Sequence, residues 1–547
     1  MKNIISRVLA IALTGALISS CAASDYQIWG SQPARAEQML NTLTPTDLPT
    51  LVPSITPSPS VTPLRELPMP GSATSTPEPT QTPDLSQLSS AELTASAGAP
   101  SATLPSVNNS GPMDVYTTQG GDTLAVLAKR FQLDVSQFVA SVVLPAPDQL
   151  LPSGILLVMP KSDPLVKYGP ADKTIPDSEF VYGPATIGFN SGDYIRQQNG
   201  YLATYMADLS SGKISGPDAV ERIASENSIN PKLILAVIEY ESHWVLGNPT
   251  NLAQDEYPLG YVNYQYRNFF RQLMWASGQL SEGYYRWRSG DLTELTFKDG
   301  GRIRIDPRLN AASAAIQFYF SQNHTRTEWD QALTAGGFLA LYTKMFGDPW
   351  LHAGSFEPAI PANLTQPALT LPFEPGKIWA FISGPHSAWE REGGALAALD
   401  LAPPSNAPGC IPSDYWVLAP AAGRVVRVGQ GLVILDLDGD GFEQTGWDIL
   451  FMHISNDGKV KLGQVLKTGD HIGHPSCEGG VATGTHLHIA RKFNGEWILA
   501  GGPVPFNLGG WIAHNGNLPY QGTLTRDGVT VTANQYSDGK SHISWNQ

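Results

Sequence analysis

Histidine is concentrated in one part of this 547-residue chain, and the spacing of two histidines indicates where chemistry could occur. Six of the eleven histidines lie within 386–488, namely His386, His453, His471, His474, His486 and His488. The segment Thr483-Gly-Thr-His486-Leu-His488 separates two imidazoles by a single residue. In a β-strand, side chains two residues apart point to the same face. The pattern therefore predicts that His486 and His488 enter one site while Leu487 enters the opposite layer.

The surrounding sequence predicts the strands that must position these side chains. Segments 423–428, 432–436 and 447–453 read as strands, each bounded by Gly or Asp turns. We therefore expect a compact antiparallel β domain over residues 375–515. His386 and Asp400 lie on its approach, 14 residues apart (400 − 386). Two histidines and one carboxylate with an open fourth position are a recurrent arrangement in hydrolytic zinc sites.

These residues resemble the lysostaphin-like zinc endopeptidases, and most closely their β-lytic, staphylolysin-type branch. The resemblance covers about residues 378–515 and implies that His386, Asp400 and His488 bind zinc. It also implies that His453 and His486 are a catalytic pair that does not bind the metal. The expected reaction is hydrolysis of stem or cross-bridge peptide bonds in peptidoglycan. The matching segments are Gly384-Pro-His386-Ser, Leu399-Asp400, Phe451-Met-His453, the run from Cys477 to His488, and Asn494-Gly495.

One position departs from the commoner branch of this family. That branch places its first histidine four residues before the aspartate, where this chain has Leu396. In the β-lytic branch the histidine lies further upstream, where His386 stands, and this favours an intact site. If that ligand is lost, the domain resembles degenerate members that only regulate other hydrolases. The alternative function is therefore a non-catalytic, peptidoglycan-binding envelope scaffold or an activator of other hydrolases.

A second motif of the same domain could hold a different metal. Asp436, Asp438 and Asp440 are followed by Gly441, which matches the spacing of the first half of an EF-hand calcium loop. The twelfth position is Trp447 instead of the usual Glu. Because predicted strands flank the motif, an acidic hairpin tip built on Asp-Gly turns fits equally well. Calcium binding and a hairpin tip therefore both remain open.

The middle of the chain, residues 178–352, is expected to be helical, with Asn230 capping a helix whose first residue is Pro231. At 100° per residue, Glu241 falls within the apolar face of that helix, and Glu239 falls nearly opposite, where a solvated charge is expected. The Glu241-Ser242 pair resembles the lytic transglycosylase branch of the lysozyme-like folds, which implies that Glu241 is a general acid. The Gly-Leu-Met-Gln segment of that family is absent. A structural or glycan-docking domain with a buried, paired Glu241 is the alternative.

Residues 115–160 predict a small β-α-α-β module with a Gly-Asp-Thr-Leu turn. This order resembles a LysM module, and the resemblance implies binding to N-acetylglucosamine-containing glycans such as peptidoglycan. A small structural spacer is the alternative.

The N-terminal region and the composition predict the location of the protein. Residues 1–20 have a charged start and a short apolar run, and they end in a segment that resembles a bacterial lipobox before Cys21. We expect Cys21 to carry a lipid that anchors the chain to a membrane of the bacterial envelope, outside the cytoplasm. Residues 21–113 form a Pro/Ser/Thr-rich linker, and residues 516–547 are expected to be a polar tail. The net charge of −15 argues against nucleic-acid binding.

Cys410 and Cys477 are the two cysteines that remain once Cys21 is assigned to the anchor. In an oxidising compartment, such an even pair is expected to form a disulfide. A free, buried thiol at Cys477 is the alternative. The complete expectation is a multidomain chain: a disordered linker, a βααβ module, an α-helical lysozyme-like domain and an antiparallel β peptidase domain.

Overall fold

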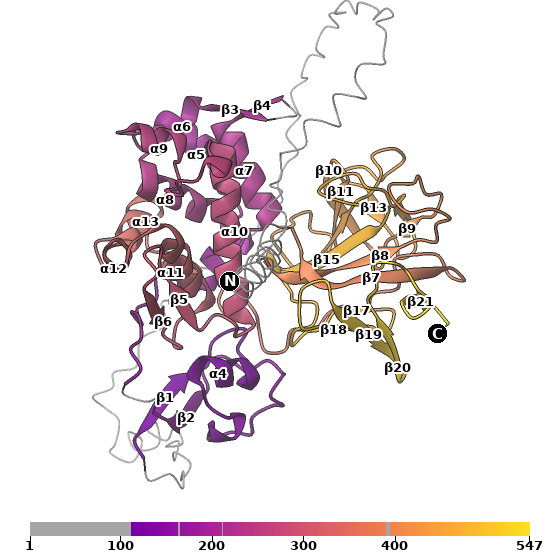
Figure 1. The fold of residues 1–547 in the computed structure, drawn as a ribbon, viewed down its shortest axis with the longest axis horizontal. Coiled ribbons are helices and arrows are strands. Elements are labelled where there is room, and N and C mark those ends of the chain that lie inside the picture. Colours follow the sequence, from indigo (N-terminus) through magenta and orange to yellow (C-terminus); the bar gives the residue numbers. More distant parts are fainter. Residues whose placement is uncertain (1–110, 162–164, 210–211, 390–393, 547) are drawn as a thin grey trace, which may run out of the picture. The chain divides into compact units, whose positions relative to one another are not determined.

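The computed structural model describes residues 111–161, 165–209, 212–389 and 394–546 (Figure 1). By its internal contacts the chain separates into two units, 1–102 and 103–547, and every described residue belongs to the second. The predicted signal peptide, the lipid site at Cys21 and nearly all of the linker lie outside the described residues. Among the residues that are described, no helix is both long and apolar enough to cross a bilayer.

The first folded element is a small module built on one antiparallel strand pair, and it has one α-helix instead of the two expected. It consists of β1 (Met113–Thr117), α4 (Leu124–Phe131), a single 3₁₀ turn (Val135–Gln137) and β2 (Leu156–Pro160). The predicted second helix is wrong because the chain returns to extended backbone directly after the turn. Val139 then pairs with Val158 of β2. Prolines at 145 and 147 further oppose helix in this segment.

The middle segment is helical, as expected, with two short hairpins between the helices (Figure 1). Its helices bury a common core that includes Leu233, Ile234, Val237 and Ile238 of the predicted apolar face. The elements are η3 (Asp177–Glu179), η4 (Pro184–Thr186), α5 (Ser191–Gln198), α6 (Tyr201–Thr204), β3 (Met206–Leu209), β4 (Gly212–Ser215), α7 (Gly216–Asn227), α8 (Pro231–Ser242), α9 (Leu252–Glu256), η5 (Tyr264–Tyr266), α10 (Phe269–Arg288), β5 (Glu294–Thr296), β6 (Arg302–Arg304), α11 (Ala311–Asn323), α12 (Arg326–Ala332), α13 (Phe338–Phe346) and α14 (Pro349–Ala353).

The C-terminal part contains the antiparallel β domain that the sequence predicts. Its main sheet has the order β13-β10-β11-β12-β15-β8-β7-β21, with β16 added to β15. The strands of this sheet are β7 (Ile378–Ser387), β8 (Leu396–Ala402), β10 (Gly423–Gly429), β11 (Leu432–Asp436), β12 (Trp447–Met452), β13 (Val465–Leu466), β15 (Leu487–Phe493), β16 (Glu496–Trp497) and β21 (His542–Ser544). A short pair joins β9 (Val417–Leu418) to β14 (His471–Gly473), and a four-stranded sheet consists of β17 (Asn507–Leu508), β18 (Trp511–Asn515), β19 (Gly522–Arg526) and β20 (Val529–Thr532).

Residues 516–547, expected to be a polar tail, instead belong to this domain. β19 and β20 complete the four-stranded sheet, and β21 pairs with β7 at the edge of the main sheet. The short strands of this region bury only alternate residues, such as Leu524, Val531 and Ile543. The polar residues between them mask the strand pattern in the sequence.

The two faces of the main sheet pack in different cores. Leu399, Phe451 and Ile489 lie in the core of the β domain, whereas Ala398 and Ala490 lie in the core that the helices of the middle segment form. Because side chains alternate along a strand, Asp400 and His488 point to the same face as Ala398 and Ala490. The site described next therefore opens on the face that the helical segment borders.

Candidate metal centre

Asp400 and His488 are held directly opposite each other on neighbouring strands. They form a register pair of β8 and β15, and the Nδ1 atom of His488 lies 3.1 Å from the Oδ1 atom of Asp400. Both side chains are buried. Their neighbours Leu487, Ile489 and Leu401 fill the core on the opposite face, as the two-residue spacing predicts. The hydrophobic alternation of two strands therefore fixes two of the three predicted ligands.

His386 reaches the same point through an irregularity in β7. The β7–β8 register shifts between Ser383 and His386, around Gly384 and Pro385. A Cβ atom at Gly384 would lie 2.4 Å from the backbone of Gln521, so only glycine allows the chains to approach this closely. The bulge turns His386 into the site, and this explains how a histidine 14 residues before the aspartate replaces one at position 396.

The three predicted ligand atoms form a compact triangle. The Nε2 atom of His386 lies 3.0 Å from Nδ1 of His488 and 3.2 Å from Oδ1 of Asp400. With the 3.1 Å separation of His488 and Asp400, these edges approach the separation of about 3.3 Å expected for tetrahedral ligands 2.0–2.1 Å from zinc. The donor set and its spacing therefore fit a zinc ion, with no fourth protein ligand required.

Backbone carbonyls orient the two ligand imidazoles. Nδ1 of His386 donates to the carbonyl of Gly384 at 2.8 Å, and Nε2 of His488 donates to the carbonyl of Ala388 at 3.1 Å. Each bond fixes the proton on the outer nitrogen and leaves the lone pair of the inner nitrogen for a metal.

His453 and His486, the predicted catalytic pair, lie beside the ligands. Their ring centroids are 4.4 Å apart, and Nε2 of His486 lies 3.8 Å from Oδ1 of Asp400. His453 directly follows β12 with a φ of 61°, a conformation uncommon for a non-glycine residue. Nδ1 of His453 donates to the carbonyl of Glu478 at 3.2 Å, and Nδ1 of His486 donates to that of Gly484 at 2.7 Å. The Nε2 atom of each ring is therefore available to the site.

Burial and neighbouring charges shift the pKa values of the clustered residues in different directions. Burial favours the neutral form of Asp400, but the charges of His386 and His486 outweigh it and hold the pKa of Asp400 well below its usual range. Burial lowers the pKa of His386, yet Asp400 reverses this and raises it overall. Burial lowers the pKa of His488 in spite of its bond to Asp400. Burial, followed by repulsion from His486 and His488, lowers the pKa of His453 to about 3, so this ring is neutral.

Sequence reasoning missed Tyr520, whose ring stacks on His386 with centroids 4.6 Å apart. Tyr520 has a φ of 70°, and its carbonyl accepts a 2.8 Å hydrogen bond from the backbone N–H of Gly384. It lies between β18 and β19, in the region expected to be a tail. No local pattern signals this contact, because it depends on the packing of the 520–522 segment against the bulge in β7.

A disulfide joins Cys410 to Cys477, as the cysteine count suggests, with Cα atoms 5.7 Å apart. Cys477 opens the loop that carries Glu478 and Gly479, and the carbonyl of Glu478 orients His453. The bond therefore braces the loop whose carbonyl orients His453 of the predicted catalytic pair.

Asp436, Asp438 and Asp440 also converge, at the tip between β11 and β12, where their ligand atoms lie within 4.8 Å of one another. Strands, not helices, flank this loop, so it is no EF-hand but a hairpin tip with calcium-loop spacing.

Glu241 lies near the C-terminal end of α8 and is surrounded by donors. The hydroxyl of Tyr319 lies 3.3 Å from its Oε1 atom, Nδ2 of Asn323 lies 3.2 Å away, and Nε2 of His324 lies 3.1 Å away. Its role as a general acid stays a prediction. Glu239 is not solvated as expected: it is buried and accepts hydrogen bonds from the backbone N–H groups of Val245 and Leu246. Since α8 is buried on nearly all sides, helical phase alone could not show which carboxylate faces water.

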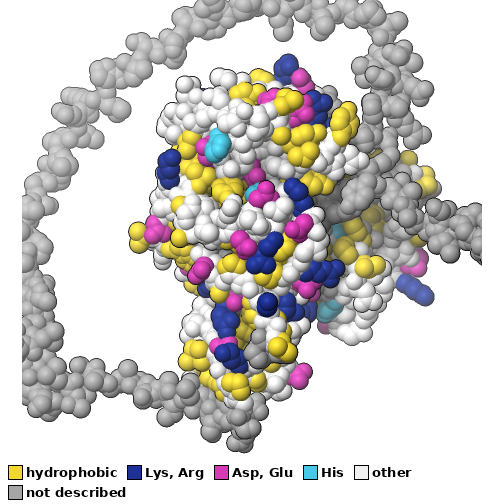
Figure 2. Space-filling model, turned by 60° about the vertical axis from the view of Figure 1, so that its left-hand side comes forward, with side chains coloured by type: hydrophobic (Ala, Val, Ile, Leu, Met, Phe, Trp, Pro, Cys, Tyr) yellow, Lys and Arg dark blue, Asp and Glu magenta, His cyan; other side chains and the backbone are white. Residues whose placement is uncertain are grey.

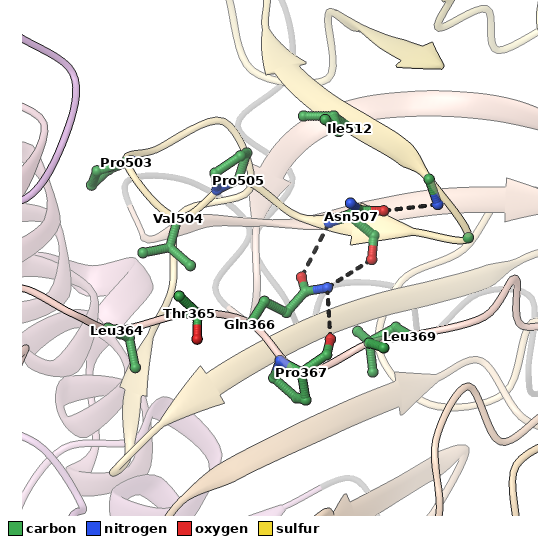
Figure 3. Close-up of a pocket in the computed structure, with 13 residues that line it drawn as sticks. Leu364, Thr365, Gln366, Pro367, Leu369, Pro503, Val504, Pro505, Asn507 and Ile512 are labelled. Atoms are coloured by element: carbon green, nitrogen blue, oxygen red, sulfur yellow. Dashed lines mark hydrogen bonds between the residues drawn. The ribbon is translucent and has the colours of Figure 1, made fainter. Parts of the chain in front are cut away.

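One cavity of the described residues is lined by none of the predicted site residues. A cavity of about 530 Å³ lies between residues 364–369 and 503–512, braced by Gln366, whose Nε2 donates to the carbonyl of Asn507 at 2.7 Å (Figure 3). Its lining is mainly proline and aliphatic, so it offers no acid–base group. On the face shown in Figure 2, Lys and Arg side chains are interspersed with Asp and Glu.

Comparisons with known proteins relate the chain to a protease. A family model described as "LasA, N-terminal domain" matches residues 173–361. Protease LasA of Pseudomonas aeruginosa strain UCBPP-PA14 is 25% identical over 357 residues, 61% of this chain and 78% of that protein. Protease LasA of strain PAO1 is 25% identical over 358 residues. The aligned share of this chain exceeds the family match, so the similarity extends beyond the helical segment and supports a peptidase domain.

Several solved structures also match. The M23 metalloprotease pseudoalterin from the deep sea is 20% identical, with a TM-score of 0.26, covering 31% of this chain and 96% of that one. The catalytic domain of lysostaphin from Staphylococcus simulans is 23% identical, with a TM-score of 0.16, covering 22% and 81%. A zinc-containing peptidase from Vibrio cholerae is 18% identical, with a TM-score of 0.19, covering 26% and 41%.

Proposed function

We propose that the C-terminal domain is a zinc-dependent endopeptidase that hydrolyses stem or cross-bridge peptide bonds of peptidoglycan. The observation that carries this proposal is the triangle of His386, Asp400 and His488, with edges of 3.0–3.2 Å and two further imidazoles beside it. The similarity to a protease over most of that protein's length supports the same reaction class.

The residues of the chain have distinct roles in this reaction. His386, Asp400 and His488 hold the metal, which, when bound, activates a water molecule and polarises the scissile carbonyl. His453 keeps the lone pair of Nε2 for the site because its Nδ1 donates to the carbonyl of Glu478, and it accepts the proton of the attacking water at Nε2. His486 acts in the form that carries a proton on each ring nitrogen: Nδ1 donates to the carbonyl of Gly484, and Nε2 donates to the oxygen on which negative charge develops.

The remaining regions are proposed to bring this domain to its substrate. The β1–α4–β2 module docks on glycan strands, and the lipid on Cys21 tethers the chain to a membrane outside the cytoplasm. Both roles rest on sequence resemblance. The module and the peptidase domain would bind the same polymer, peptidoglycan, and this agreement supports the combined proposal.

The alternative, a scaffold without activity, requires the loss of a ligand or of the catalytic pair. All five side chains are present and converge, and the two ligand imidazoles are each oriented by a carbonyl. This arrangement favours the enzyme over the scaffold.

The test is product analysis of purified peptidoglycan digested by the full-length protein. New peptide amino termini, detected by mass spectrometry, are expected from the wild type and absent from His488→Ala. His514→Ala is the matched control, because His514 is exposed and bonds only to Thr525 among the described residues. If the protein holds no zinc and His488→Ala releases the same products, the proposal fails.

A further inference from the structure

We propose that Glu478 is a positioning residue for the peptidase reaction, because it holds both the ring of His453 and the chain that follows it. This inference rests on the proposed function and adds a residue to it. Among the described residues, the carboxylate of Glu478 accepts hydrogen bonds from Ser455 and Asn456 and from none of the three predicted ligands. Glu478 therefore acts on the reaction through His453.

The backbone of His453 is held on one side by residues 476–478. His453 has a φ of 61°, and a non-glycine residue keeps this conformation only where its surroundings maintain it. Its carbonyl accepts hydrogen bonds from the backbone N–H and the hydroxyl of Ser476, at 2.6 and 3.0 Å. The hydroxyl of Ser476 in turn accepts from the backbone N–H of Glu478 at 3.0 Å.

The side chain of Glu478 holds the residues on the other side of His453. Its Oε1 atom accepts from the hydroxyl of Ser455 at 3.2 Å. Its Oε2 atom accepts from the backbone N–H of Asn456 at 3.1 Å and also from the side-chain amide of that residue. A carboxylate forms stronger hydrogen bonds than a neutral acceptor does. One residue therefore joins segment 476–478 to segment 455–456 across His453.

The ring of His453 depends on the same residue. Its Nδ1 atom donates to the carbonyl of Glu478 at 3.2 Å, the long end of the ordinary range, so a small shift of this carbonyl would break the bond. The turn between β10 and β11 supports the carbonyl, since a Cβ atom at Gly431 would lie 2.1 Å from its oxygen. The bond keeps the proton on Nδ1, and the position of the carbonyl determines where Nε2 points.

The alternative is that the carboxylate of Glu478 only closes a surface turn. Glu478 is partly exposed, and a single hydrogen bond adds little net stability. Two features distinguish it from an ordinary turn residue: its partners directly follow His453, and its own carbonyl binds the ring of His453. Because a displacement of about 1 Å can lower a rate about 10²-fold, its effect on rate should exceed its effect on stability.

The test is a double-mutant cycle in the full-length, zinc-loaded protein, with release of amino termini from a soluble peptidoglycan fragment as the readout. Glu478→Ala removes three accepted hydrogen bonds and should lower kcat about 10–100-fold, while KM, bound zinc and melting temperature stay close to wild type. In the His453→Ala background the same change should lower the rate no further, because there is no ring left to position. Single-turnover reactions with excess protein measure the slow background rate.

A conservative variant and a matched control accompany the cycle. Glu478→Gln keeps an acceptor oxygen and should recover most of the lost rate. Asp470→Ala is the control, because the carboxylate of Asp470 also accepts from a backbone N–H, that of Lys467, but in the turn between β13 and β14. Asp470→Ala should cleave at the wild-type rate.

A second readout needs neither zinc nor cleavage. In the metal-free protein with ¹⁵N-labelled histidine, the Nδ1–H signal of His453 is assigned by its loss in His453→Ala. This signal should exchange slowly with water in the wild type and in Glu478→Gln. In Glu478→Ala it should exchange faster, because the carbonyl that binds this proton is no longer held in place.

Each outcome decides the role of Glu478. Wild-type cleavage by Glu478→Ala, an equal loss of rate in both backgrounds, or loss of zinc would overturn the inference and leave a turn residue. Should Glu478→Ala fail to fold, Ser455→Ala removes one donor from the other side. Its smaller loss of rate should likewise vanish in the His453→Ala background, and a wild-type rate would overturn the inference. A wild type that releases no amino termini would overturn the proposed function, and this inference with it.

Discussion

Asp400 and Glu241 are two buried carboxylates that sequence patterns select as site residues, and each lies against imidazole. Around Asp400, the ring nitrogens of His386 and His488 approach within 3.2 Å, and backbone carbonyls hold the protons of both rings on the far side. Around Glu241, the hydroxyl of Tyr319, the amide of Asn323 and one imidazole supply donors. The first cluster gathers the lone pairs that the proposed metal would use, whereas the second supplies hydrogen-bond donors to its carboxylate.

The difference shows that a buried carboxylate is not enough to indicate a reaction. What decides its chemistry is which atoms of its neighbours face it, and second partners such as the carbonyl of Gly384 determine this. Asp400 thus has the neighbours of the proposed metal ligand, while the neighbours of Glu241 are hydrogen-bond donors.

The largest expected effect separates these two carboxylates directly. Asp400→Ala should remove zinc and with it both water activation and carbonyl polarisation, so peptide cleavage should fall by about 10⁴-fold or more, beyond the loss of a single acid–base group. Glu241→Gln should leave cleavage unchanged. The measurements are bound zinc, by mass spectrometry of the metal, and the rate of release of amino termini.

The same digests test whether Glu241 is a general acid. Anhydro-muropeptides that form with the wild type and disappear with Glu241→Gln would show that the middle domain cleaves glycan and that Glu241 is an acid. Their absence from both digests keeps Glu241 in a structural role.

The sequence predicts a contact well when the interacting residues are close together in the chain, and poorly when they are far apart. The same-face placement of His486 and His488 and the helix start at Asn230 depend on neighbours two to four residues away, and the structure has both. The close approach of Gly384 to Gln521 and the stacking of Tyr520 on His386 join segments more than 100 residues apart. No local periodicity in the sequence predicts these contacts, so only the family resemblance identifies His386 as a site residue.

Local sequence pattern gives the wrong structure where burial in the folded chain overrides it. Glu239 was expected in water because it lies opposite the apolar face, but α8 is enclosed and its C-terminal end uses Glu239 to bind two backbone N–H groups. The expected second helix of the first module fails because Val139 pairs with β2. Tertiary contacts decide both cases, and helical periodicity cannot register them.

The next effect tests whether the imidazoles beside the zinc ligands are catalytic. His453→Ala should retain zinc, because His453 lies outside the ligand triangle, but should lower the rate by about 10²–10⁴-fold. His471→Ala is the control, since His471 belongs to the same domain but stacks on Trp416 away from the triangle. A His453→Ala variant with wild-type rate and full zinc would remove this residue from the mechanism.

A smaller effect concerns the stability of the donor cluster. Glu241→Ala removes the shared acceptor of Tyr319, Asn323 and His324, and should lower the free energy of unfolding by about 1–3 kcal/mol. Tyr319 and Asn323 also donate to the carbonyl of Leu259 at 3.0 Å, which limits the loss. Glu241→Gln keeps one acceptor oxygen and should lose less. Denaturant unfolding, with exposed Asn248→Ala as control, measures the difference.

The smallest effect is a pH dependence confined to the Glu241 cluster. Burial lowers the pKa of His324, but the hydrogen bond and charge of Glu241 outweigh it and raise that pKa above its ordinary value. The folded state therefore binds the proton more tightly than the unfolded state, whose histidine pKa is about 6.5. The resulting stabilisation is complete below about pH 6.5 and is lost as pH rises through the higher, folded pKa. Hydrogen-exchange protection of α8 and α11, corrected for intrinsic rates, should fall over this window in the wild type. In His324→Gln, whose amide donates at every pH, it should stay flat. Protection that rises with pH in the wild type would mean that His324 is neutral in the folded state, so that its bond to Glu241 carries no charge.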